Sequence, residues 1–261
     1  MRQCLFCENS ADSLEHVLPQ WLLRALAPDS AGRMPAKSGF FHEFDGYSMT
    51  RDLDSLSFKT RRVCAKCNNG WMAELEGDVQ LFLSPLVEDA AADFPSSSIT
   101  RLQENAECLS VWLAKTALLA SHALPNAQPL MDIVSPAQIV NGNPVIGVWV
   151  DFPMAQQGDE DFGASVSRQF LVQNGNLPIG YRDAPGTFHF CIRANRLLLR
   201  IGRCPNATVG YFGNQGAAPI RIFPPRSGTV HRNFEYRDFN QFVGSVMLTT
   251  FKDCTGEVPV P

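Results

Sequence analysis

Apolar residues recur at helical spacing between residues 101 and 124, and this pattern predicts one long helix that packs on a core. Thr100 followed by Gln103 forms a capping box, which sets the expected start of the helix. The serine run 96–98 just before it predicts a linker. A second helical pattern extends from residue 78 to about residue 93. The apolar positions of the long helix are Leu102, Ala106, Leu109, Leu113, Ala117 and Ala120.

The pattern changes near residue 144 to short apolar stretches that are typical of β-strands. The clearest hairpin joins residues 188–192 to residues 197–201 across a short turn. Helices followed by strands indicate the α+β class, with a mixed helix-plus-antiparallel-sheet region after the N-terminal segment. Further strands are expected at residues 145–150, 169–172 and 220–223.

The N-terminal segment combines short elements with loops. Residues 14–18 predict a short strand, and Pro19 can open a helix at its first turn. Residues 28–56 contain repeated Pro and Gly, which predicts a loop-rich insertion. Another helix is expected to begin near Asn68.

These changes of pattern predict two domains, residues 1–77 and residues 78–261. Within the second domain, residues 78–143 are acidic and helical, whereas residues 144–261 are rich in strands and arginine. The composition is that of a globular protein, with 45% hydrophobic and 18% charged residues. No apolar run approaches the ~20 residues that span a bilayer. The N-terminus also lacks the apolar core of a signal peptide. We therefore expect a cytoplasmic protein with reduced thiols and no membrane partner.

The net charge of −4 conceals a strong segregation of charge along the chain. Residues 78–167 carry two Lys/Arg and eleven Asp/Glu, a net −9, whereas residues 168–232 carry nine Arg and one Asp, a net +8. Guanidinium groups bind phosphate in bidentate fashion, so this segment is a candidate nucleic-acid surface. Alternatively, the arginines pair with the acidic segment. The candidate contacts are Arg193, Arg196, Arg200 and Arg203.

Four of the eight cysteines form two C-x-x-C pairs, Cys4 with Cys7 and Cys64 with Cys67. In a reduced compartment such pairs indicate metal ligands, and four thiolates match a closed tetrahedral Zn²⁺ site. No coordination position stays open for water, so the zinc is expected to be structural. The 56 residues between the pairs add little to the entropy of loop closure. The single cysteines, Cys108, Cys191, Cys204 and Cys254, are expected to be core residues.

The sequence around these pairs carries a further motif. It consists of Cys4-x-x-Cys7, then Leu14-Glu15-His16-Val17-Leu18-Pro19, and then Val63-Cys64-x-x-Cys67-Asn68-Asn69-Gly70-Trp71-Met72. This combination resembles the HNH endonuclease family, in the four-cysteine zinc form of its ββα-metal (His-Me) finger, a treble-clef-like fold. The resemblance covers about 75 residues at the N-terminus and does not extend to residues 95–261.

The resemblance implies roles for three residues. His16 would be the general base that activates water, and Glu15 and Asn68 would hold a catalytic divalent ion. Oxygen ligands suit Mg²⁺ or Mn²⁺ better than zinc. The middle asparagine of the family has no clear match, since Lys59 or Thr60 occupies that region. On the following helix, Glu74 and Glu76 are expected on a solvated face.

Three functions remain open at this point. The first is a metal-dependent HNH-type endonuclease that hydrolyses phosphodiester bonds of DNA. The second is a non-catalytic zinc-finger module that binds nucleic acid, also through the arginine-rich segment. The third is an interaction protein that oligomerises through the helix at residues 101–124. The sequence does not choose between DNA and RNA, nor does it give the oligomeric state.

Overall fold

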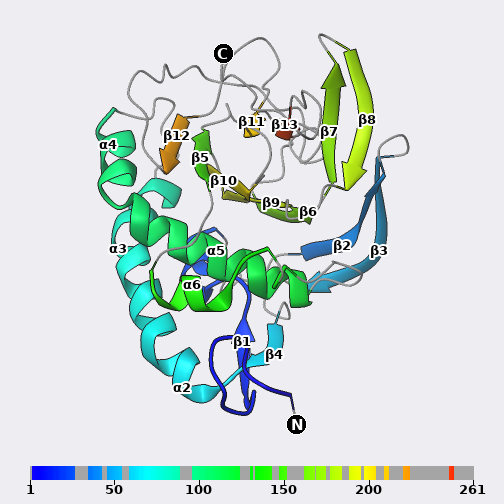
Figure 1. Ribbon diagram of the computed structural model, residues 1–261. Coiled ribbons are helices and arrows are strands. Elements are labelled where there is room, and N and C mark those ends of the chain that lie inside the picture. Colours follow the sequence, from blue (N-terminus) through cyan, green and yellow to red (C-terminus); the bar gives the residue numbers. More distant parts are fainter. Residues whose placement is uncertain are drawn as a thin grey trace. The chain divides into compact units, whose positions relative to one another are not determined.

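The chain forms two compact units, Met1–Phe40 with Ser48–Val145 and Phe41–Tyr47 with Ile146–Pro261, in a computed structural model (Figure 1). The predicted boundary between residues 77 and 78 lies inside a helix of the first unit, and that division into domains remains a prediction. The structure describes residues 2–26, 35–42, 46–54, 59–88, 96–123, 130–131, 133–142, 147–151, 162–167, 169–174, 177–183, 188–194, 197–203, 209–211, 220–223 and 247–249.

All helices of the described residues belong to the first unit. They include a short π-helical turn, η3, which is interrupted at Gly70 by non-helical backbone angles (φ −99°, ψ −119°). The bounds are α1 (Gln20–Leu26), α2 (Ala65–Cys67), η3 (Asn68–Met72), α3 (Ala73–Glu88), α4 (Ser96–Glu104), α5 (Ala106–Ala123) and α6 (Pro136–Val140).

The first unit also contains an antiparallel pair of strands, β1 (Ser13–His16) and β4 (Lys59–Val63). Their register pairs Glu15 with Thr60 and His16 with Lys59, and it shifts between Ser13 and Glu15. The strand and helix expected on either side of Pro19 are confirmed as β1 and α1. After β4 the chain enters α2 directly, so two antiparallel strands are followed by a helix.

Helix α5 is the centre of the core of the first unit. It packs on α3, β4 and α6, and its residues from Leu109 to Ser121 are all buried. A helix without a polar face is stable only when it is covered on all sides, which explains this central position. The apolar residues of α5 from Leu109 to Ala120 are thus covered within the chain itself. Among the described helices, none combines the length and the apolar character needed to cross a membrane.

The single long helix predicted for residues 101–124 is two helices, α4 and α5, with a turn at Asn105. The side-chain Nδ2 of Asn105 donates a 2.8 Å hydrogen bond to the carbonyl of Arg101, which also accepts the Asn105 backbone N–H. Such local side-chain bonds compete with the helical ladder. The helix begins at Ser96 and not at Thr100, so its predicted start was wrong. The prediction of a linker at residues 96–98 was also wrong, because these serines form the first turn of α4.

The prediction of a loop-rich insertion at residues 28–56 was also wrong in part. This segment contains β2 (Pro35–His42) and β3 (Gly46–Asp54), which pair as a two-stranded sheet. Both strands contain Gly or Pro, yet they also contain aromatic residues such as Phe40 and Tyr47, which favour strands.

In the described residues from 147 onward, the second unit contains two sheets. The five-stranded sheet has the order β12-β5-β10-β9-β6 and is antiparallel, and the four-stranded sheet has the order β11-β13-β7-β8. Strand β13 pairs in parallel with β7, which departs from the predicted antiparallel sheet. The bounds are β5 (Gly147–Asp151), β6 (Phe162–Ser167), β7 (Gln169–Asn174), β8 (Leu177–Asp183), β9 (Phe188–Ala194), β10 (Leu197–Arg203), β11 (Val209–Tyr211), β12 (Ile220–Phe223) and β13 (Met247–Thr249).

The predicted hairpin is confirmed as β9 and β10, with Ala194 opposite Leu197 and Phe188 opposite Arg203. Alternate residues of each strand are buried, as expected for a strand with one face on a core. These buried residues are Phe188, Phe190, Ile192, Ala194, Leu197, Leu199 and Ile201.

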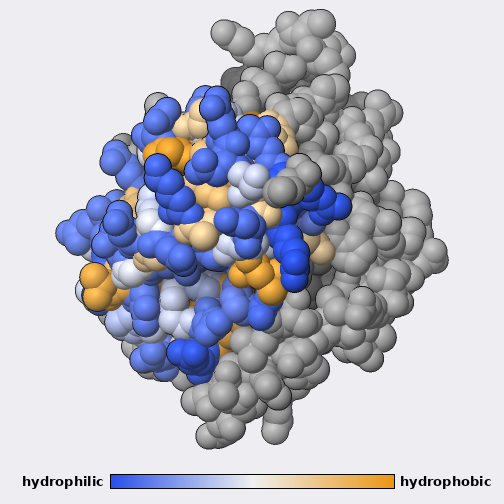
Figure 2. Space-filling model, turned by 90° about the horizontal axis from the view of Figure 1, so that it is seen from below, coloured by the Kyte–Doolittle hydropathy of each residue, from blue (hydrophilic) through white to orange (hydrophobic). Residues whose placement is uncertain are grey.

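Apolar side chains on the surface of the first unit are scattered. In Figure 2, hydrophilic residues predominate on the visible face of the described residues, and hydrophobic ones appear in small separate groups. Isolated apolar side chains of this kind are normal on a protein surface. The large exposed ones among the described residues are Leu14, Leu81, Met131 and Val140.

Candidate metal centre and active site

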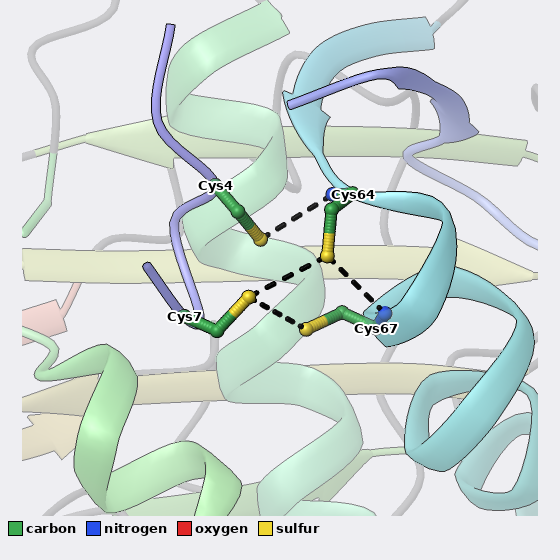
Figure 3. A group of neighbouring side chains, drawn as sticks. All are labelled: Cys4, Cys7, Cys64 and Cys67. Carbon is green, nitrogen blue, oxygen red and sulfur yellow. Dashed lines mark hydrogen bonds between the residues drawn. The ribbon is translucent and has the colours of Figure 1, made fainter. Parts of the chain in front are cut away.

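The four paired cysteines converge at one point (Figure 3). All four sulfur atoms lie within 4.8 Å of one another, and Cys7 Sγ is 3.5 Å from Cys64 Sγ and 3.6 Å from Cys67 Sγ. A zinc ion with Zn–S bonds of ~2.3 Å requires its sulfurs to be ~3.8 Å apart. The predicted cluster is therefore confirmed, and its geometry is consistent with structural Zn²⁺.

Backbone N–H groups of both knuckles point at the sulfurs. Cys4 Sγ accepts hydrogen bonds from the N–H of Phe6 (3.4 Å) and of Cys64 (3.3 Å), and Cys64 Sγ accepts one from the N–H of Cys67 (3.4 Å). The Leu5 N–H also donates to the Arg62 carbonyl, at 2.9 Å. These bonds hold the two knuckles together and favour the thiolate form of the sulfurs.

The thiols differ in their tendency to ionise. Burial raises the pKa of Cys4 and of Cys67, and neighbouring thiols raise that of Cys67 further. Burial also opposes ionisation of Cys64, but hydrogen bonds from the Cys67 N–H and the adjacent thiols lower its pKa to about 7. Four thiolates this close repel one another unless a cation lies between them. Four soft sulfur ligands in a tetrahedral arrangement suit zinc.

Asn68 is the first residue after the second knuckle, and its side chain is tied to β1. Its Nδ2 donates a 2.7 Å hydrogen bond to Ser13 Oγ, and the Asn68 side chain also hydrogen-bonds the Glu15 carboxylate. The predicted pair of oxygen ligands, Glu15 and Asn68, is thus brought together although 53 positions separate them in the chain.

His16 follows Glu15 on β1 and is partly exposed. Gln20 Nε2 lies 3.5 Å from its Nδ1 and 3.4 Å from its Nε2, so the amide does not single out either ring nitrogen. Burial and the nearby Lys59 lower the pKa of His16, while Glu76 acts in the opposite sense. The net shift favours the neutral imidazole. Lys59, one of the two residues in the region of the family's middle asparagine, is paired with His16 in the register of β1 and β4, and Thr60, the other, is paired with Glu15.

Glu15 is buried, with 7% of its surface exposed. Its Oε1 lies 3.9 Å from the Nζ of Lys115, and the same ammonium contacts Glu76 Oε1 at 2.5 Å. Burial raises the pKa of Glu15 to about 7; Lys115 and Asn68 act against that shift, and Glu76 adds to it.

Lys115 and Glu76 are the site residues that sequence reasoning missed. The solvated position expected for Glu76 was wrong, because its side chain is 23% exposed and is paired with Lys115. Glu74 is exposed, as predicted. The sequence could have indicated Lys115, because it is the one Lys or Arg in the otherwise largely apolar sequence of α5. A charged residue within a buried helix requires a partner of opposite charge.

The candidate arginines belong to the second unit. Arg193 is in β9 and pairs with Leu198, while Arg200 and Arg203 are in β10 and pair with Cys191 and Phe188. Arg196 lies outside the described residues, as do the side chains of the other three. Their role as phosphate contacts stays a prediction.

Comparison of the chain with protein-family models, with curated proteins and with solved structures gave no match. The assignment of a function therefore depends on the residues of the site itself.

Proposed function

We propose that the chain is a metal-dependent endonuclease of the HNH type that hydrolyses phosphodiester bonds of DNA. The observation that supports the proposal is the segment of two antiparallel strands and a helix, joined by the four cysteines, in which Asn68 is hydrogen-bonded to β1, the strand that carries Glu15 and His16. This order of elements is that of a ββα-metal finger.

His16 is the proposed general base. Its imidazole is partly exposed, so water can reach it, and its lowered pKa favours the neutral ring, which is the form that accepts a proton. A positioned base of this kind contributes about 10²–10⁴-fold to a hydrolytic rate. The Gln20 amide lies within 3.5 Å of both ring nitrogens.

The side chains of Glu15 and Asn68 fit a hard divalent cation. Glu15 offers a carboxylate and Asn68 an amide oxygen, and the bond to Ser13 engages the amide nitrogen of Asn68 rather than that oxygen. Such oxygen donors suit Mg²⁺ or Mn²⁺. A bound ion of this type would stabilise negative charge on the scissile phosphate and the leaving oxygen.

The zinc, unlike the Mg²⁺ or Mn²⁺ ion, takes no part in the proposed reaction. With four thiolate ligands it has no open position for water, so it is a structural ion. It fixes the first knuckle against α2, and thereby Asn68 against β1.

One observation favours the alternative of a zinc-finger module that binds nucleic acid without cleaving it. Lys59, and not an asparagine, is paired with His16, so the usual orienting amide of the family is absent from that position. A lysine at position 59 can contact a phosphate group of nucleic acid, and this contact does not require a catalytic site.

The test is a supercoiled-plasmid nicking assay in Mg²⁺ and in Mn²⁺, with zinc-loaded wild type, His16→Ala and Asn68→Ala. We expect the wild type to nick DNA and both folded variants to be slower by about 10²-fold or more. Equal rates for wild type and His16→Ala would show that His16 is not the base. If the wild type shifts DNA on a gel but does not cut it, the binding module is the better account.

A further inference from the structure

Lys115 lies on α5, outside the proposed nuclease finger, and is completely buried. An ammonium group without water is costly unless opposite charges compensate it. Lys115 has two such partners, Glu76 on α3 and Glu15 on β1. The lysine therefore links α5 to two separate elements of the finger.

Two carboxylates share this one ammonium, and the Asn68 amide lies beside one of them, that of Glu15. Lys115 itself is inaccessible, with 0% of its side chain exposed, whereas the Glu76 side chain is 23% exposed. The lysine thus approaches the carboxylates from the buried side. It cannot contact a phosphate, so any role in the reaction has to be exerted through Glu15 and Glu76.

We infer that Lys115 is a positioning residue for the divalent ion of the proposed nuclease, because it fixes the Glu15 and Glu76 carboxylates from behind. The inference rests on the proposed function and deepens it, since it makes α5 part of the catalytic centre. Partners that hold a metal ligand from outside typically contribute 10–100-fold to metal affinity. A finger that ends before α5 would lack this support.

The test is Mn²⁺ binding to the zinc-loaded full chain, followed by electron paramagnetic resonance, for wild type, Lys115→Met and Thr116→Val. Thr116 is the matched control: it is equally buried on α5, and its hydroxyl donates to the Trp112 carbonyl rather than to the carboxylates. We expect Lys115→Met to bind Mn²⁺ about 10–100-fold more weakly, with one zinc per chain retained, and Thr116→Val to bind like the wild type. Lys115→Arg, which keeps the charge, should recover part of the affinity.

Unchanged Mn²⁺ affinity in folded Lys115→Met would overturn the inference and leave the proposed nuclease intact. The same loss in Thr116→Val would also overturn it, because it would indicate a general effect of α5 packing. A wild type that binds no Mn²⁺ besides its zinc would contradict both proposals.

A second measurement covers the case in which Lys115→Met does not fold. In the wild type, substoichiometric Mn²⁺ should broaden the nuclear magnetic resonance signal of the Lys115 ammonium, and excess Mg²⁺ should restore it. A Lys115 signal that stays sharp while Mn²⁺ is bound would place the ion elsewhere and overturn the inference.

Discussion

The carboxylate of Asp12 accepts a 2.8 Å hydrogen bond from the backbone N–H of Ala65, which lies 53 residues later in the chain. Ala65 is the first residue of α2, and the first N–H groups of a helix have no partner within it. The loop that follows the first knuckle therefore caps α2, the helix within the second knuckle.

This cap predicts the effect of substitutions at Asp12. Asp12→Ala should lower the free energy of unfolding by about 1 kcal/mol, the usual contribution of such a cap. Asp12→Asn keeps an acceptor oxygen and should lose less. Denaturant unfolding of the zinc-loaded proteins measures both values. If Asp12→Ala is as stable as the wild type, the bond does not contribute to stability.

The cysteine cluster predicts the metal content of the protein. Cys67→Ser removes one of the four ligands and should leave less than one zinc per chain, whereas Cys108→Ser should retain one, because Cys108 lies outside the cluster. The zinc content of the purified proteins, together with their melting temperatures before and after a chelator, tests this. One zinc in Cys67→Ser, or none in the wild type, would contradict the assignment.

Two leucines of α3 give a matched pair for the core of the first unit. Leu83 is 1% exposed and Leu81 is 72% exposed. Leu83→Ala should cost about 2–5 kcal/mol, because it removes buried methyl groups and leaves a cavity. Leu81→Ala should stay within about 0.5 kcal/mol of the wild type. Similar losses of unfolding free energy for the two variants in urea would contradict the burial of Leu83 in the core.

His122 near the end of α5 predicts how stability depends on pH. Burial, together with the nearby Arg62, lowers the pKa of His122 below its ordinary value of 6.5, so the folded state favours the neutral ring. Between the two pKa values the unfolded chain binds more protons, and the free energy of unfolding therefore falls as pH decreases through 6.5.

The measurement compares wild type with His122→Gln in denaturant unfolding at about pH 8 and about pH 5.5, on either side of the ordinary histidine pKa. Protonation of His16 and of the zinc ligands affects both proteins alike. The variant should lose less stability on acidification than the wild type does. An identical loss would mean that His122 is not buried in its neutral form.

The parts of the fold that were predicted from the sequence depend on local patterns. A C-x-x-C knuckle has a nearly fixed geometry, so Cys4, Cys7, Cys64 and Cys67 indicated one cluster without any knowledge of the intervening chain. The hairpin of β9 and β10 follows from the alternation of apolar residues over two adjacent stretches.

The parts that were missed depend on contacts with no local signature. The break at Asn105 results from one side-chain hydrogen bond to Arg101, which the apolar spacing does not encode. The position of Lys115 is fixed by carboxylates 39 residues and more away in the chain. Ionic contacts between residues so far apart in the sequence depend on how α5 packs. The sequence indicates only that a buried charge needs a partner of opposite charge.

The central claim is that His16 accepts the proton of the attacking water. The most direct test is chemical rescue of zinc-loaded His16→Gly in the plasmid-nicking assay with Mg²⁺ or Mn²⁺. The account predicts that the variant nicks at least ~10²-fold more slowly than the wild type, and that free imidazole restores part of the rate without accelerating the wild type. Nicking by His16→Gly at the wild-type rate, or no nicking by the wild type in either metal, would contradict it.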